Sequence, residues 1–169
     1  MVRLTPMNNG EADSWLSTSV VEYANGLMKT RDMSKDEATP LAEETLQKLL
    51  PNREATPGHI FSWITDSEAR IGRLWYGPSP TDDMALYIYD ISIDEGAQGR
   101  GFGGEVLDLV AELATDKGLS AVELNVFGDN AGARRLYERK GFVAVHEHKG
   151  QIGMRLDISQ RQKGGHPSV

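Results

Sequence analysis

The sequence predicts an α/β fold: one domain built on a mixed, twisted sheet that is flanked by helices. The second half alternates strand, helix, strand and helix, which is the order of a parallel crossover. The first half holds two short runs typical of an antiparallel hairpin. A chain of 169 residues, 39% hydrophobic and 25% charged, is long enough for one domain with a sizeable core.

The N-terminal part predicts a short edge strand followed by two helices. Asn8 with Glu11 marks the start of the first helix, and Ser34 with Glu37 forms a capping box for the second. The apolar residues recur at helical period over the first of these segments. The expected elements are a strand at 2–5, a helix at 9–29 and a helix that reaches residue 50.

Pro40 complicates the second helix, because an interior proline removes a backbone hydrogen bond. Alternatively, Thr39 is the cap and Pro40 is the first helical residue, a position that proline favours. A kink or a restart is therefore expected at Pro40. Four leucines of this helix are expected in the core: Leu41, Leu46, Leu49 and Leu50.

The remaining strands are predicted from alternating apolar residues, and the remaining helices from apolar residues at helical period that end at a glycine. Strands are expected at 60–65, 70–76, 84–93, 121–127, 142–148 and 152–158, and helices at 101–117 and 130–140. Residues 1–159 are predicted to form one domain, and the polar residues 160–169 a disordered tail.

Composition excludes several classes of function. The net charge of -7 argues against a general nucleic-acid or anionic-membrane surface and mildly favours a cationic or neutral substrate. The chain has no cysteine, which rules out disulfides and a cysteinyl acyl-enzyme. No apolar run is long enough for a membrane span, and the N-terminus lacks the apolar core of a signal peptide, so the cytoplasm is the default expectation.

A glycine-rich loop follows the apolar strand at 84–93. Its glycines, Gly99, Gly101 and Gly103, allow a ligand to approach the main chain closely. The loop opens a helix, whose first free N–H groups form an anion site, and Arg100 adds a permanent cation suited to phosphate oxygens. The stretch therefore predicts a pocket for a diphosphate.

Two other interpretations of this loop compete. Gly99, Gly101 and Gly104 match the dinucleotide fingerprint, but a polar turn at 94–98 separates the strand from the first glycine. Repeated strand–helix units on both sides are also missing. A P-loop is excluded because no Gly-Lys-Ser/Thr follows. An ordinary glycine-rich loop without a ligand is the remaining alternative.

A second stretch favours one of these interpretations. Residues 124–142 follow the pattern N-x-x-A-x-x-L-Y-x-x-x-G-F, carried by Asn130, Ala133, Leu136, Tyr137, Gly141 and Phe142. Together with the segment QGRGFG at 98–103, this pattern resembles the GNAT superfamily of acyl-coenzyme A-dependent N-acetyltransferases. The resemblance is specific from about residue 85 to 142, whereas the first eighty residues match only in general layout.

The resemblance implies acetyl-coenzyme A as cosubstrate and direct transfer of the acetyl group to a primary amine, on a small molecule or a peptide, within a ternary complex. It also implies that the strands at 84–94 and 121–127 splay apart to admit the pantetheine arm, and it leaves a homodimer open. The implied cofactor-binding residues are Ile91, Ile93, Gln98, Gly99, Arg100, Gly101, Phe102, Gly103, Asn130 and Tyr137.

The candidate acid is Tyr137, because a tyrosine stays protonated at neutral pH and can protonate a leaving thiolate. The alternative is a core tyrosine. Asn130 either contacts the cofactor or caps its helix.

The candidate base is Asp90, a carboxylate inside an otherwise apolar strand. The alternatives are a structural role for Asp90, the weaker candidate Glu123, or a chain of waters. No metal site is expected, since His146 and His148 lack further nearby ligands.

Two other functions stay open at this point. A protein of the same fold could sense coenzyme A without turnover, and a nicotinamide- or flavin-binding domain would also use a glycine-rich loop. The identity of the acceptor amine is not encoded in any motif of the first eighty residues.

Overall fold

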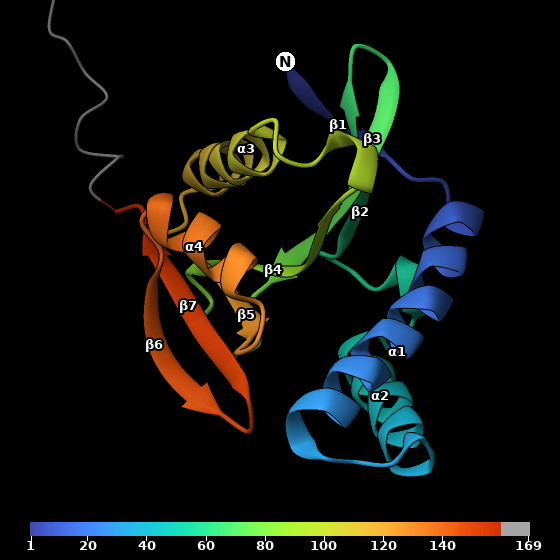
Figure 1. Ribbon diagram of the computed structural model, residues 1–169. Coiled ribbons are helices and arrows are strands. Elements are labelled where there is room, and N and C mark those ends of the chain that lie inside the picture. The colour runs from blue at the N-terminus through green and yellow to red at the C-terminus, as the bar shows by residue number, and fades with distance from the viewer. Residues whose placement is uncertain (160–169) are drawn as a thin grey trace, which may run out of the picture.

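The computed structural model describes residues 1–159, and the predicted disordered tail lies outside the described residues. These residues contain a seven-stranded sheet in the order β1-β2-β3-β4-β5-β7-β6 (Figure 1). Its strands are β1 Val2–Pro6, β2 Ile60–Asp66, β3 Ala69–Pro78, β4 Ala85–Ile93, β5 Ala121–Phe127, β6 Val143–His148 and β7 Gln151–Asp157. The mixed α/β sheet predicted from the sequence is confirmed.

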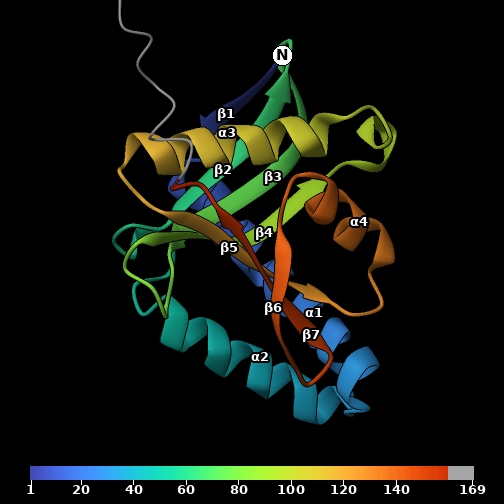
Figure 2. The same ribbon diagram turned by 90° about the vertical axis from the view of Figure 1, so that its left-hand side faces the viewer.

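Helices cover both faces of the sheet. They are α1 Asn9–Arg31, α2 Lys35–Leu49, α3 Phe102–Asp116 and α4 Ala131–Arg139. The pair α3 and α4 lies on one face, and α1 and α2 lie on the other (Figures 1 and 2). Within residues 1–159, no helix has the length and apolar character needed to cross a membrane. Each face of the sheet therefore packs against a different pair of helices.

Both predicted capping boxes are present. The side chain of Asn8 accepts from the N–H of Glu11, and that of Ser34 accepts from the N–H of Glu37. The predicted restart at Pro40 is wrong, since α2 runs unbroken through it. Pro40 has no N–H to donate to the carbonyl four residues earlier in the helix. Because Pro40 is exposed, water can hydrogen-bond that carbonyl instead. The cap at Ser34 starts the helix, and one lost bond does not end it.

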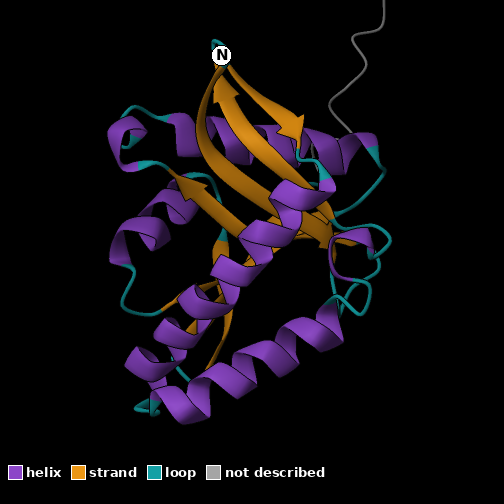
Figure 3. Ribbon diagram, turned by 90° about the vertical axis from the view of Figure 1, so that its right-hand side faces the viewer, coloured by secondary structure: helices purple, strands orange, loops and turns teal. Residues whose placement is uncertain are grey.

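The α1–α2 hairpin packs through small side chains. Ala38 and Ala42 are the buried residues of α2, and Figure 3 shows α1 and α2 diverging in a V from the loop that joins them. Of the four leucines predicted in the core, Leu50 is buried just after the helix, and the other three are half-buried against the clusters around α1. Alanine at the contact allows the two helices to approach closely, which pushes the leucines to its flanks.

The first three strands form an antiparallel meander. β1 is the edge strand predicted from the sequence and pairs with β2, and the β2–β3 hairpin turns at Ser67 and Glu68. Both turn residues have positive φ, 47° and 72°, as a tight hairpin turn requires. The main core lies between this sheet and α3, where Val106 and Val110 are fully buried.

The centre of the sheet is interrupted between β4 and β5. These strands pair in parallel only from Ala85 with Ala121 to Ile88 with Leu124. β5 continues along β7, whereas β4 continues along β3, so the two strands separate beyond Ile88 (Figure 1). The predicted splay is confirmed.

An irregularity in β4 coincides with this separation. Opposite β3, Tyr76 pairs with Ile88 and Trp75 pairs with Asp90, which leaves Tyr89 as an extra residue. Because side chains normally alternate between the faces of a sheet, the bulge changes which residues point to each side. It allows the consecutive side chains of Tyr89 and Asp90 to line the same cleft.

Candidate active site

The glycine-rich loop forms an open, backbone-lined end to α3. Gly99 and Gly101 have φ values of 74° and 86°, in the left-handed region that favours glycine. Gly101 is the N-cap of α3 and provides no side chain to bond the first N–H groups. A Cβ atom at Gly99 or Gly101 would meet no atom within 4 Å. The loop thus presents bare N–H groups, with partial positive charge, to an open space that fits an anion.

The other predicted residues of this segment each make a different contact. Arg100 is exposed, and its guanidinium carbon lies 4.8 Å from the centre of the Phe102 ring, which is buried. Gln98 donates its side-chain N–H to the carbonyl of Ile93 at 2.9 Å and so fixes the turn. A Cβ at Gly103 would lie 3.0 Å from Leu136 of α4. Gly103 is therefore required for close packing of α3 on α4, a role that the sequence did not indicate.

Ile91 and Ile93 lie on the part of β4 beyond its pairing with β5. Their side chains are half-buried against the main core. Since pairing with β5 ends at Ile88, the β5-facing main-chain groups of this part of β4 have no strand partner among residues 1–159. Such an edge can bind an extended chain by strand-like hydrogen bonds. Its position suits the pantetheine contacts expected for these two residues.

Tyr137 lies on α4 and points into the core. Its side chain is 8% exposed, and its ring packs against Phe142 with centroids 5.9 Å apart. Burial raises the pKa of Tyr137 to about 12, and the negative charge of Asp90 adds to that rise. The hydroxyl is therefore protonated at neutral pH, and Asp90 is close enough for its charge to act on it.

Asn130 caps α4. Its side chain accepts from the N–H of Ala133 at 3.2 Å, so the capping role is confirmed. The residue is also exposed, which leaves its amide nitrogen accessible. A contact with the cofactor stays a prediction.

Asp90 is a buried carboxyl at the point where β4 and β5 separate. Burial, together with the charge of Glu22 on α1, raises its pKa to about 6. Arg73 on β3, the indole N–H of Trp15 and the N–H of Ile91 act in the opposite direction. Trp15 Nε1 has no full hydrogen bond among the described residues, so its effect on Asp90 is that of a longer contact. Asp90 can thus change its protonation state near neutral pH.

A cleft of about 590 Å³ opens on the α1–α2 side of the sheet and has Asp90 in its lining. This volume is in the range of small-molecule sites. Its walls come from α1, α2, β3, β4 and β5, and they include five aromatic side chains: Tyr23, Trp75, Tyr87, Tyr89 and Phe127. The glycine-rich loop belongs to the α3–α4 side, so the separation of β4 and β5 lies between the loop and the cleft (Figure 1).

The sequence analysis did not single out most of this cleft. Glu22, Phe127 and the two β4 tyrosines were not identified as functional. The available signal was the aromatic alternation of Tyr87 and Tyr89 next to a carboxylate in the same strand. The α1 side of the cleft carries no comparable local signal, because helix residues at this spacing are usually core.

Glu123, the weaker candidate base, is held in an ion-pair network. It accepts from the hydroxyl of Ser79 at 2.8 Å and from Arg155 at 3.2 Å. Arg155 also donates to Asp82 at 2.8 Å. These bonds occupy both carboxylate oxygens of Glu123 and hold them away from a reacting amine.

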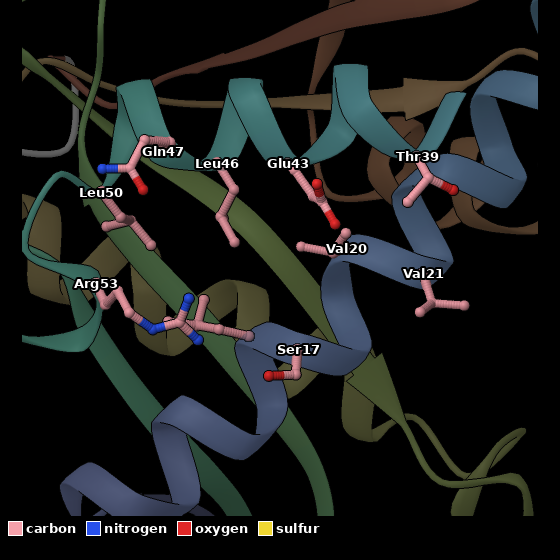
Figure 4. A pocket seen from close by; sticks show the side chains of 10 residues that line it. Ser17, Val20, Val21, Thr39, Glu43, Leu46, Gln47, Leu50 and Arg53 are labelled. Atoms are coloured by element: carbon pink, nitrogen blue, oxygen red, sulfur yellow. The ribbon is translucent and has the colours of Figure 1, made fainter. Parts of the chain in front are cut away.

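A second pocket is present besides this cleft. A pocket of about 430 Å³ lies between α1, α2 and the turn after α2, with Ser17, Val21, Glu43 and Arg53 at its rim (Figure 4). No strand residue lines it, so it is separate from the splayed strands.

In residues 1–159, no group of three or more His, Cys, Asp or Glu side chains is placed to hold a metal ion.

Comparison with known proteins agrees with this geometry. A sequence model described as the acetyltransferase (GNAT) family matches residues 27–142. The uncharacterized N-acetyltransferase YycN of Bacillus subtilis is 30% identical over 143 residues, which is 83% of this chain and 92% of that protein. A mycothiol acetyltransferase of Beutenbergia cavernae is 37% identical over 109 residues, but these cover 52% of this chain and 37% of that protein.

Solved structures show the same fold. The YycN crystal structure from Bacillus subtilis superposes with a TM-score of 0.79 at 28% identity and covers 88% of this chain and 96% of that one. The PaiA N-acetyltransferase of Thermoplasma acidophilum, solved in complex with coenzyme A, has a TM-score of 0.62 at 12% identity, with coverage of 93% and 99%. The matched residues include both the glycine-rich loop and Tyr137, and the chain therefore belongs to the acetyltransferase (GNAT) family and is an N-acetyltransferase.

Proposed function

We propose that residues 1–159 form a single N-acetyltransferase domain that transfers an acetyl group from acetyl-coenzyme A directly to a primary amine, within a ternary complex. The observation that carries this proposal is the separation of β4 and β5. It connects a loop suited to a diphosphate with a cleft that contains an ionisable carboxyl. Two reactants entering from opposite sides of the sheet can meet there without a covalent acyl-enzyme.

The loop and the exposed part of β4 would hold the cofactor. The free N–H groups around Gly101, with Arg100, suit its diphosphate. The unpaired edge near Ile91 and Ile93 suits the amides of the pantetheine arm. Bound acetyl-coenzyme A supplies an activated acetyl thioester at the separation of the strands.

The amine nitrogen then forms a bond to the thioester carbonyl carbon, and the amine loses a proton to Asp90, directly or through water. A main-chain N–H near Ile91 would stabilise the developing oxyanion, an interaction worth about 3 kcal/mol in other enzymes. The carbon–sulfur bond breaks, its electron pair goes to sulfur, and Tyr137 donates a proton to the thiolate. Each proton and electron pair thus has a donor and an acceptor in the site.

The pKa values of the two groups suit this order of events. Burial keeps Tyr137 protonated, and the charge of Asp90 makes it a weaker acid. When Asp90 accepts the proton of the amine, that charge disappears. The resulting fall in the pKa of Tyr137 comes at the stage when the thiolate, whose conjugate acid has a pKa near 8.5, requires a proton.

A free-thiol assay with acetyl-coenzyme A and a panel of primary amines tests the proposal. We expect thiol release that depends on the amine, an N-acetylated product of matching mass, and intersecting lines in two-substrate initial-rate plots. Thiol release without an amine, or parallel lines, would contradict direct transfer. Binding of coenzyme A without thiol release for any amine would instead support a sensor of the same fold.

A further inference from the structure

The acceptor cleft has two aromatic walls. On the sheet side, the ring of Tyr89 stacks on Trp75 with centroids 4.8 Å apart and lies 4.6 Å from Tyr87. Facing α1, Phe127 at the end of β5 lies 6.2 Å from Tyr23. These five residues all line the cleft. Their flat faces favour an apolar, planar group over a strongly hydrated one.

The charges in the cleft are few and mostly negative. Among the described residues that line it, Glu22 and Asp90 are the carboxylates and Lys48 is the cation. Lys48 is already paired with Glu44 at 2.8 Å. Arg73, near Asp90, lies over the ring of Trp15 and 3.7 Å from Glu22. A carboxylate or phosphate on the substrate would therefore compete with Glu44 for Lys48, the one cation among the described lining residues.

Glu22 is placed to attract a cation to the cleft. Its side chain projects from α1, is 54% exposed and is only loosely paired with Arg73. Glu22 and the buried Asp90 line the same cleft, and the charge of Glu22 raises the pKa of Asp90. An ammonium group passing Glu22 would also lie over aromatic faces, which attract cations.

We infer that the acceptor is a primary amine carried on an aromatic or similarly flat apolar group, whose ammonium enters past Glu22 towards Asp90. This inference rests on the proposed function and adds the substrate class. A polyamine fits less well, because it has no flat apolar group to pack against the rings. An amino acid fits less well, because its carboxylate would face Glu22 and Asp90.

The test compares kcat/KM at saturating acetyl-coenzyme A for four small amines. The probe is 2-phenylethylamine; phenylalanine adds a carboxylate to it, propylamine lacks the ring, and spermidine carries further cations. We expect 2-phenylethylamine to exceed each of the other three by at least tenfold. Phe127→Ala, and separately Tyr23→Ala, should reduce its advantage over propylamine at least fivefold.

A matched pair of variants tests the acidic residue. At pH 8, above the pKa of Asp90, Glu22→Gln should raise KM for 2-phenylethylamine at least threefold with kcat nearly unchanged, because it removes the attraction for the ammonium. At lower pH it should also move the inflection of kcat towards lower pH, because the charge of Glu22 raises the pKa of Asp90. Glu43→Gln is the control, since Glu43 also lies in this helical pair but lines the separate pocket of Figure 4. It should leave both constants unchanged.

The results distinguish an error in the substrate class from an error in the proposed acetyl transfer. Faster turnover of spermidine or phenylalanine, or an unchanged preference in both folded aromatic variants, would overturn the substrate class and leave acetyl transfer intact. Equal effects of Glu22→Gln and Glu43→Gln would overturn the assignment of Glu22. Binding of coenzyme A with no thiol release for any amine would overturn both proposals.

Discussion

At the scale of single residues, Asp90 is a buried carboxyl whose ionisation destabilises the folded protein. The folded protein holds a proton on Asp90 up to a pKa of about 6, whereas in the unfolded chain it is released near pH 4. Between these values the folded state binds more protons, so this residue's contribution to stability falls as pH rises. The cost at pH 8 is about 3 kcal/mol, the equivalent of a two-unit pKa shift. Retention of such a residue favours a functional role.

Asp90→Asn should therefore raise the melting temperature more at pH 8 than at pH 4.5. Its kcat/KM should fall and lose the inflection near pH 6 that the wild-type enzyme should show, because the amide cannot accept the amine's proton. Melting curves and rate profiles over this range would test both. Asp83→Asn, at an exposed position, should change neither. Lower stability of Asp90→Asn at pH 8, with full activity, would favour the purely structural role.

Tyr137 can be tested by removal of its hydroxyl alone. Tyr137→Phe keeps the ring that packs against Phe142. If Tyr137 protonates the thiolate, kcat should fall about 10²-fold or more, while affinity for coenzyme A stays within a few-fold. The loss should shrink for an acyl donor with a more acidic thiol. A variant with wild-type kcat at saturating substrates would exclude this role.

At the scale of elements, the loop and α3 form one unit whose two ends provide a matched comparison. Gly101 at the start and Gly118 after the end have φ values of 86° and 73°, and a Cβ at either would meet no atom within 4 Å. The backbone cost of alanine should be similar at both, about 1 kcal/mol. Only Gly101 faces the space proposed for the diphosphate.

Gly101→Ala and Gly118→Ala should therefore lower the melting temperature by similar amounts. Calorimetric affinity for coenzyme A should fall at least tenfold in Gly101→Ala and remain near wild type in Gly118→Ala, because only the first adds an atom against the ligand. Equal affinities in the two variants would show that the diphosphate site lies elsewhere.

At the scale of the whole molecule, the separation of β4 and β5 is the feature on which both ligand sites depend. The main-chain groups of β4 beyond Ile88 that face β5 have no strand partner. Coenzyme A bound along this edge should slow amide hydrogen exchange in residues 89–93. Exchange in residues 85–88, which already pair with β5, should change little. Hydrogen-exchange mass spectrometry with and without coenzyme A distinguishes these segments, and unchanged exchange in 89–93 would contradict pantetheine binding there.

Much of the fold could be predicted because its signals are local. The capping boxes at Asn8 and Ser34, the turn before β3 and the glycine-rich loop each depend on residues a few positions apart. The order of strands and helices after residue 84 fixed the parallel crossover, and the two motifs indicated the family. Pro40 was misjudged because the strength of the cap at Ser34 and the exposure of the proline outweigh one lost bond.

The sequence by itself thus determined the elements, the family and the position of the anion-binding loop, since these follow from short-range spacing. Only the tertiary structure decided the acceptor cleft, because its walls come from α1, α2, β3, β4 and β5, which are spread along the chain. It also decided the environment of Asp90: a carboxyl's pKa depends on burial and on charges such as Glu22 and Arg73, which folding alone brings near it.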